Sequence, residues 1–167
     1  VCQRLFEFRA KYVLNLYSLF HFLLIFSPFN YFLIVSLVRL NIKGISYSQT
    51  QSGAYALVLS ENEGERTLPI IIGAFEAQSI AIALEKEIKP PRPLTHDLFK
   101  TFADRFNIHI KQVIIHKLVD GVFYSSLICE SDGIEEIIDA RTSDAIALAI
   151  RFGCPIYVYS NILEQAG

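Results

Sequence analysis

The feature that most constrains the fold of this chain is an internal repeat. Residues 38–87 align without gaps to residues 106–155, an offset of 68 positions, and 8 of the 50 aligned pairs are identical. Both halves show the same order of local patterns, three strands and then a helix. We therefore predict one α+β domain built from a duplicated β-β-β-α unit. The repeat places Glu76 and Asp144 at equivalent helix starts, which is a plausible frame for a symmetric cleft.

Local sequence patterns predict the individual strands and helices. Strands are indicated where apolar and polar residues alternate, or where short β-branched runs are bounded by turn residues. Helices are indicated where good helix formers recur with apolar positions three and four apart. We expect a mixed or antiparallel sheet, with a linker and a connecting helix at 88–105 between the two units. The predicted strands are 38–43, 54–60, 67–72, 109–118, 122–130, 134–140 and 155–159, and the predicted helices are 74–87, 96–106 and 144–152.

Caps and turns set the expected boundaries of these elements. Thr95 follows a proline-rich linker and is the expected N-cap of the connecting helix. Ser143 is the expected cap of the last predicted helix, which Gly153 should end. The dipeptide Asp120-Gly121 predicts a tight β-hairpin.

The first 37 residues differ from the rest of the chain. They hold ten of its 21 aromatic residues, and the stretch Tyr12–Val38 has 27 residues and no charge. Such a run exceeds the roughly 20 residues that span a bilayer, which favours a membrane anchor. The chain also lacks methionine, even at position 1, which favours a misassigned start near residues 35–38. Both interpretations stay open; we prefer the second, and with it a cytoplasmic protein.

Cysteine content and charge narrow the classes of function. The three cysteines lack the spacing of a zinc site and indicate free thiols in a reducing compartment. From Val38 onward, 12 Lys and Arg stand against 16 Asp and Glu, a formal charge of −4. Proteins that bind nucleic acid usually carry a basic surface, because neutralising phosphates drives much of their affinity. The acidic balance therefore argues against strong binding to nucleic acid.

Several charged side chains lie at the ends of predicted elements, where a fold can gather them around one pocket. Each also has a purely structural explanation. A carboxylate at a helix start is favoured by the positive end of the helix dipole. A salt bridge of Arg141 with Asp139 or Asp144 would hold a strand-to-helix junction. The candidate residues are Glu76, His96, Asp97, Asp139, Arg141 and Asp144.

Four motifs in a fixed order carry a resemblance to a known family. They are Leu68–Gly73 followed by Glu76-Ala77, then Arg92–Asp97, then Asp120–Tyr124, and then Ile138–Leu148. With these motifs the chain resembles the bifunctional nuclease (BFN) domain family over about Val38–Leu163. The family usually has Arg-Pro-Ser where this chain has Arg141-Thr142-Ser143, a minor departure.

The resemblance implies hydrolysis of phosphodiester bonds in DNA and RNA by a small α+β domain. That reaction needs a positioned water, a partner for the charge on the phosphoryl group and a proton for the leaving oxygen. Carboxylates supply the first of these through bound Mg²⁺ or Mn²⁺; the expected ligands are Glu76, Asp97, Asp139 and Asp144. We expect catalysis by Asp97, Asp139 and Asp144, with His96 as general acid or base and Arg141 pairing with a phosphate oxygen. Arg141, Arg92 and Lys100 are the expected substrate contacts.

A second class of function stays open beside the nuclease. The same Arg141–Asp144 pocket suits a non-catalytic ligand-binding or regulatory module, for instance one that takes a small phosphorylated ligand. A nuclease loses turnover with a chelator, whereas a binding module shows ligand-dependent stabilisation without product. Apolar strands with few charges on one face also predict a homo-oligomer.

Overall fold

The computed structural model describes residues 36–48, 53–85 and 87–167. They belong to one compact unit, Val35–Gly167. The predicted extension at residues 1–37 lies outside the described residues, apart from its last two positions. Among the helices that the structure describes, none is both long and apolar enough to cross a membrane.

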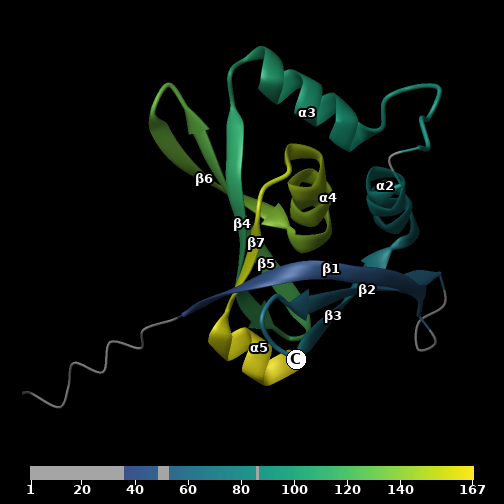
Figure 1. Cartoon of the computed structure of the whole chain (residues 1–167), viewed down its shortest axis with the longest axis vertical. Coiled ribbons are helices and arrows are strands. Elements are labelled where there is room, and N and C mark those ends of the chain that lie inside the picture. Colours follow the sequence, from purple (N-terminus) through teal and green to yellow (C-terminus); the bar gives the residue numbers. More distant parts are fainter. Residues whose placement is uncertain (1–35, 49–52, 86) are drawn as a thin grey trace, which may run out of the picture. The chain divides into compact units, whose positions relative to one another are not determined.

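Seven strands in the described part of the chain form one mixed sheet (Figure 1). Their order is β3-β2-β1-β7-β4-β5-β6; β4 and β7 run parallel, and all other neighbours run antiparallel. The predicted α+β class with a mixed sheet is confirmed. The strands are β1 (Leu37–Tyr47), β2 (Ala54–Glu61), β3 (Thr67–Gly73), β4 (His109–Val119), β5 (Val122–Ser131), β6 (Ile134–Arg141) and β7 (Ile156–Tyr159).

The helices are α2 (Ala74–Leu84), α3 (Thr95–Arg105), α4 (Thr142–Phe152) and α5 (Ser160–Ala166). Helix α4 packs against both α2 and α3. Figure 1 shows these three helices grouped together, with α5 at the opposite end of β7. Helix α5 was not predicted from the sequence, because seven residues with two neighbouring apolar positions carry little periodic signal. Its Ile162 and Leu163 are buried, so tertiary packing stabilises this helix.

The order of three strands and a helix occurs twice along the chain, as predicted. Helices α2 and α4 begin 68 residues apart (142 − 74), and so do β2 and β5 (122 − 54). The first strands do not keep this offset, because β4 begins 72 residues after β1 (109 − 37). A duplication stays a prediction. Each helix follows an edge strand directly, α2 after β3 and α4 after β6, and the two helices nevertheless touch.

Two tight turns connect β4, β5 and β6. Asp120 and Gly121 have φ of 50° and 77°, and Asp132 and Gly133 have φ of 52° and 77°. Positive φ at both central residues matches the twist of a two-residue hairpin, and Asp and Gly tolerate it better than most residues. The predicted Asp120-Gly121 hairpin is therefore confirmed.

Helix boundaries differ from the prediction at several ends. Helix α3 begins at Thr95, with Leu94 as its N-cap, because the Asp97 carboxylate accepts the Leu94 N–H at 2.9 Å. The predicted cap at Thr95 is thus wrong by one residue. Helix α2 ends at Leu84 rather than at 87, because the chain turns there and the Ile88 N–H bonds to the Glu85 carbonyl.

The ends of α4 give one correction and one confirmation. The helix begins at Thr142 with Arg141 as N-cap, and it has no side-chain cap hydrogen bond, so the predicted Ser143 cap is wrong. At the other end, Gly153 has φ of 67°, the left-handed conformation that ends many helices. The predicted stop at Gly153 is confirmed.

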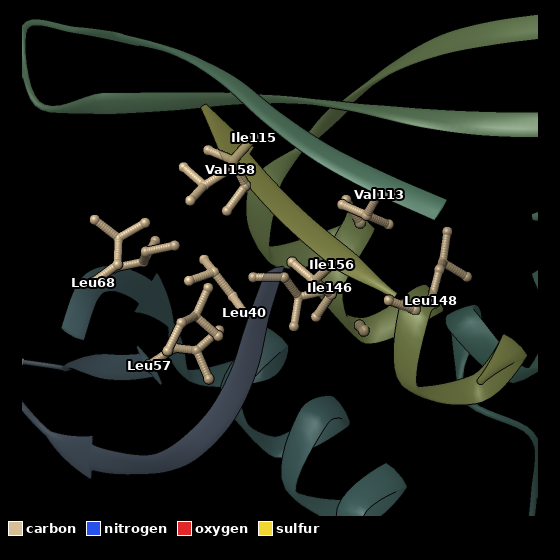
Figure 2. Close-up of a cluster of buried hydrophobic side chains, with 14 of the residues drawn as sticks. Leu40, Leu57, Leu68, Val113, Ile115, Ile146, Leu148, Ile156 and Val158 are labelled. Carbon is tan, nitrogen blue, oxygen red and sulfur yellow. The ribbon is translucent and has the colours of Figure 1, made fainter. Parts of the chain in front are cut away.

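Apolar side chains from both halves of the chain form one core. Figure 2 shows side chains of α4 packed among those of β1, β2, β3, β4 and β7. Full burial of a Leu, Ile or Val side chain contributes about 1.5–3 kcal/mol, so this cluster holds the sheet and the helix together. The labelled members are Leu40, Leu57, Leu68, Val113, Ile115, Ile146, Leu148, Ile156 and Val158.

Candidate functional site

A cleft of about 800 Å³ lies where α2, α3, α4 and β6 meet, and we call it the His96 cleft. Its walls combine charged groups with apolar side chains such as Phe75, Phe99 and Ile138. Concave sites of this size and mixed lining are typical of ligand pockets. Five residues selected from the sequence line it: Glu76, His96, Asp139, Arg141 and Asp144.

Two of the cleft's carboxylates lie at the starts of helices. Glu76 lies in the first turn of α2 and Asp144 in the first turn of α4. Gly73 directly precedes α2, and a Cβ at that position would collide with the Glu76 carboxylate. The glycine therefore lets Glu76 fold back beside the end of β3.

A buried pair of hydroxyl groups fixes the start of α4. Thr142 donates its hydroxyl proton to the Phe123 carbonyl at 3.0 Å, and its Oγ1 lies 2.6 Å from the Ser125 Oγ. Because Thr142 already donates to the carbonyl, Ser125 donates to Thr142. Both side chains are buried, so losing either partner would leave an unsatisfied polar group. This contact ties Arg141 and Asp144 to β5.

His96 is held by hydrogen bonds on both sides of its ring. Its Nδ1 lies 2.9 Å from the Ser79 Oγ, and its Nε2 lies 3.1 Å from the Asp144 Oδ1. The imidazole is only 15% exposed, so its orientation is fixed while one edge remains at the cleft. This contact joins α2, α3 and α4 at one point.

The contacts of Arg151 determine which groups around His96 donate hydrogen bonds and which accept them. Its side chain is 6% exposed, and its guanidinium donates to the Ser79 Oγ at 3.1 Å and to the Asp97 Oδ1 at 2.6 Å. A guanidinium only donates, so Ser79 accepts from Arg151 and can give its own proton to the His96 Nδ1. The His96 Nε2 then carries the proton that faces Asp144. This tautomer follows from the hydrogen-bond pattern.

Arg141 bridges the two carboxylates. Its guanidinium donates to the Asp144 Oδ2 at 2.7 Å and to Oδ1 at 3.1 Å, and it forms an ion pair with the Glu76 Oε1 at 3.1 Å. The hydrogen bonds with Asp144, followed by the charge of Glu76, raise the pKa of Arg141, so it is cationic at any practical pH. Of the two partners predicted for Arg141, Asp139 and Asp144, the structure shows the salt bridge with Asp144. With 69% of its side chain exposed, Arg141 remains accessible to a ligand.

Three residues selected from the sequence do not line the His96 cleft. Lys100 pairs with Asp104 at 2.7 Å and lies over the Phe152 ring, and Arg92 is exposed in the linker. Asp97 uses both oxygens elsewhere, on Arg151 and on the Leu94 N–H. Burial alone would raise the pKa of Asp97, but these two hydrogen bonds outweigh it and hold the pKa below its usual value. Catalytic or substrate-binding roles for these three residues stay predictions.

The expected metal ligands come together only in part. Glu76, Asp139 and Asp144 line one cleft, whereas Asp97 is bound by Arg151. Within residues 36–48, 53–85 and 87–167, no three His, Cys, Asp or Glu side chains converge as a cluster that could hold a metal ion. Glu76 and Asp144 approach each other across the Arg141 guanidinium.

Ser79 and Arg151 were missed by the sequence analysis. The sequence marks both residues only weakly. Ser79 is a serine within the apolar run of α2, and Arg151 is a single charged residue at the end of the largely apolar helix α4. A buried charge in such a position needs a partner, which is a reason to search for one. The partner, Asp97, is 54 residues away in sequence and could not be assigned without the fold.

Comparison with known proteins places the chain in a family. The model of the bifunctional nuclease domain matches residues 57–167. An uncharacterized protein of Mycobacterium tuberculosis is 43% identical over 130 residues, which cover 77% of this chain and 76% of the relative. Bifunctional nuclease 1 of Oryza sativa subsp. japonica is 33% identical over 118 residues, and bifunctional nuclease 2 is 31% identical over 117. The matches cover 35% of each rice protein.

The α+β domain with a histidine and carboxylate cleft thus has relatives in bacteria and in plants. The match to the family model covers well over half of the chain. The chain belongs to the bifunctional nuclease domain family.

Proposed function

We propose that the protein is a nuclease that hydrolyses phosphodiester bonds of DNA and RNA in the His96 cleft. The observation that carries this proposal is the hydrogen-bonded chain Ser79–His96–Asp144–Arg141–Glu76, which lines the cleft in a member of the nuclease family. It combines a histidine, two carboxylates and an exposed guanidinium. These are the groups that water activation, proton delivery and phosphate binding require.

Arg141 is the phosphate-binding group in this proposal. Its planar guanidinium can bind two oxygens at once, and phosphate oxygens compete with Glu76 and Asp144 for it. The substrate would then leave the carboxylates free to act on water. Arg141 would also stabilise negative charge that builds up on the phosphoryl oxygens during the reaction.

His96 and Asp144 divide the proton transfers between them. The Asp144 carboxylate accepts the proton of the attacking water, and the His96 Nε2–H gives a proton to the leaving oxygen. Water oxygen bonds to phosphorus while the bond to the leaving oxygen breaks. In the same step the hydrogen bond between Asp144 and His96 passes the proton taken from water to Nε2, so the neutral ring is not left as an imidazolate anion. Ser79 and Arg151 keep the imidazole in the tautomer that this cycle needs.

A divalent cation, Mg²⁺ or Mn²⁺, suits the charge of this cleft. Three carboxylates, Glu76, Asp139 and Asp144, stand against the single guanidinium of Arg141, which leaves two negative charges uncompensated. Carboxylate oxygens are the ligands that both ions prefer. We propose that Glu76 and Asp144 hold the cation and that bound waters complete its coordination, because the three carboxylates of the cleft do not converge on one point. When bound, the cation would supply charge neutralisation and a more acidic water.

Purified protein is expected to cleave labelled single- and double-stranded DNA and RNA with Mg²⁺ or Mn²⁺ and to stop in EDTA. The double variant Asp139→Ala/Asp144→Ala should lose at least 100-fold in rate, because it removes Asp144, the proton acceptor and a proposed ligand, together with a second carboxylate of the cleft. Gel analysis of the products measures this loss. Circular dichroism checks that the variant is folded, and a melting temperature that rises with Mn²⁺ only in the wild type reports cation binding directly.

Equal cleavage by the wild type and the folded double variant would contradict the proposal. A matched control is Asp132→Ala, which removes a carboxylate at the exposed β5–β6 turn and should leave the rate unchanged.

A ligand-binding module is the second candidate function. The exposure of Arg141 and the acidic balance of the domain favour it, because a small phosphorylated ligand needs no extended basic surface. A phosphorylated ligand that raises the melting temperature of the protein, with no cleavage product under any metal condition, would favour the ligand-binding module over the nuclease.

We also propose that the protein forms a homo-oligomer. Helix α3 exposes Leu98 and Phe102, its C-cap residue Phe106 is also exposed, and the edge strand β6 exposes Ile134 and Ile137. Apolar groups this exposed on an open edge favour burial against a second copy. Sedimentation velocity should therefore show a dimer or larger species, and Ile137→Lys should shift it toward monomer. A wild type that sediments only as a monomer would contradict this.

A further inference from the structure

A second hollow, of about 560 Å³, lies on the other side of the Arg141 end of β6. We call it the Tyr124 hollow; β3, the β4–β5 hairpin and the junction of β6 with α4 form it. Mostly apolar side chains line it, and two of these side chains, Ile71 and Val122, are about half exposed. The groups at its edge are polar: Asp139, Arg141 and Ser143. Its size falls in the range of small-molecule pockets.

Arg141 belongs to both cavities. It lines the Tyr124 hollow as well as the His96 cleft, and so does Asp139. A phosphate bound by the Arg141 guanidinium would therefore lie at the junction of the two. A chemical group bonded to that phosphate on the side away from His96 would lie in the apolar Tyr124 hollow.

Tyr124 and Arg141 lie side by side on the sheet and both line the hollow. Tyr124 and Arg141 are direct partners in the antiparallel pairing of β5 and β6. Side chains of such partners point to the same face of the sheet, with Cβ atoms about 4.5–5.5 Å apart. Lys117 adds a positive charge, with its Nζ 5.3 Å from the centre of the Tyr124 ring. An aromatic ring, an apolar wall and Arg141 thus line one hollow, and the Lys117 charge lies near the ring.

We propose that the Tyr124 hollow binds the nucleobase of the nucleotide whose phosphate contacts Arg141. The base would stack on Tyr124 and pack against Ile71 and Val122, while Asp139 and Ser143 offer hydrogen-bond partners at the edge. Every base has an aromatic face, so such a platform accepts DNA and RNA alike. The proposal rests on the nuclease function and adds to it: binding is directed by one stacked base rather than by a basic surface. This accounts for nucleotide binding by an acidic domain.

Binding of small phosphates tests this subsite without any cleavage. Calorimetry would compare adenosine 5′-monophosphate, ribose 5-phosphate and inorganic phosphate on the whole protein in EDTA. We expect the nucleotide to bind about tenfold more tightly than ribose 5-phosphate, which is the size of one base–aromatic stack. Tyr124→Leu should remove that preference, and Tyr124→Phe should keep it because the ring remains. Tyr47→Leu, at an exposed tyrosine outside both cavities, should leave it unchanged.

Two results would overturn the subsite. One is equal affinity of the wild type for the nucleotide and for ribose 5-phosphate, including no binding of either. The other is a preference that survives in a folded Tyr124→Leu variant. The subsite and the nuclease function can be contradicted separately. Cleavage of nucleic acid without tighter binding of the nucleotide contradicts only the proposed subsite. Tighter binding of the nucleotide without cleavage contradicts only the proposed nuclease function.

Discussion

Substituting His96 with alanine is expected to lower the rate of phosphodiester cleavage by about 10²–10⁴-fold, the contribution of a positioned general acid or base. The reason is geometric: Nε2 lies 3.1 Å from Asp144 at the cleft, so it is the imidazole atom that can pass a proton to the leaving oxygen. Single-turnover cleavage of a labelled oligonucleotide measures the chemical step directly. Its dependence on substrate concentration separates this step from binding.

The control for this prediction is His109→Ala, at an exposed histidine on β4 that lines neither cavity. It should cleave at the wild-type rate. Loss of the Ser79 contact could also slow His96→Ala by loosening α3, so added imidazole provides a second readout. Imidazole should restore part of the rate if His96 transfers a proton, and should have no effect if His96 only packs. A His96→Ala variant that keeps more than a tenth of the activity contradicts the assignment.

The sequence predicted the parts of the site that depend on local structure. Glu76 and Asp144 could be paired because each lies at the start of a helix that follows a strand, and local patterns placed both starts to within two residues. Arg141–Asp144 was foreseeable because residues three apart in a first helical turn are neighbours. Asp120-Gly121 fixed one hairpin because few dipeptides tolerate two positive φ values.

Contacts between distant segments could not be predicted in the same way. Asp97 was selected as a metal ligand because it opens a helix, yet its charge is matched by Arg151 on a different helix. The Tyr124 hollow depends on the pairing register of β5 with β6, which places an aromatic ring opposite Arg141. Neither fact follows from local propensity. Each depends on which strands and helices become neighbours.

Replacing Arg151 by methionine is expected to lower the free energy of unfolding by on the order of 2 kcal/mol, less than the cost of breaking a fully buried ion pair, because the Asp97 side chain is 35% exposed and water can reach it. Its guanidinium is 6% exposed and bonds to the Asp97 carboxylate, to Ser79 and to the Ala147 carbonyl. Methionine fills a similar volume but supplies no donor, so the carboxylate and the serine lose their partner. Urea denaturation at pH 7 measures the change. The matched control is Arg105→Met on the exposed end of α3, where a change within about 0.5 kcal/mol is expected.

The pH dependence of this loss identifies the Asp97–Arg151 pair as its source. The pKa of Asp97 is held below its ordinary value of 3.8, so the carboxylate contributes stability above pH 3.8. That contribution disappears as the pH falls through the lower pKa of the folded state, because Asp97 is then protonated and its bond to Arg151 weakens. The variant has no such contribution to lose. The stability difference between wild type and Arg151→Met should therefore be largest at neutral pH and should narrow below pH 3.8. A difference that stays constant across this range would assign the effect to packing of the Arg151 side chain alone.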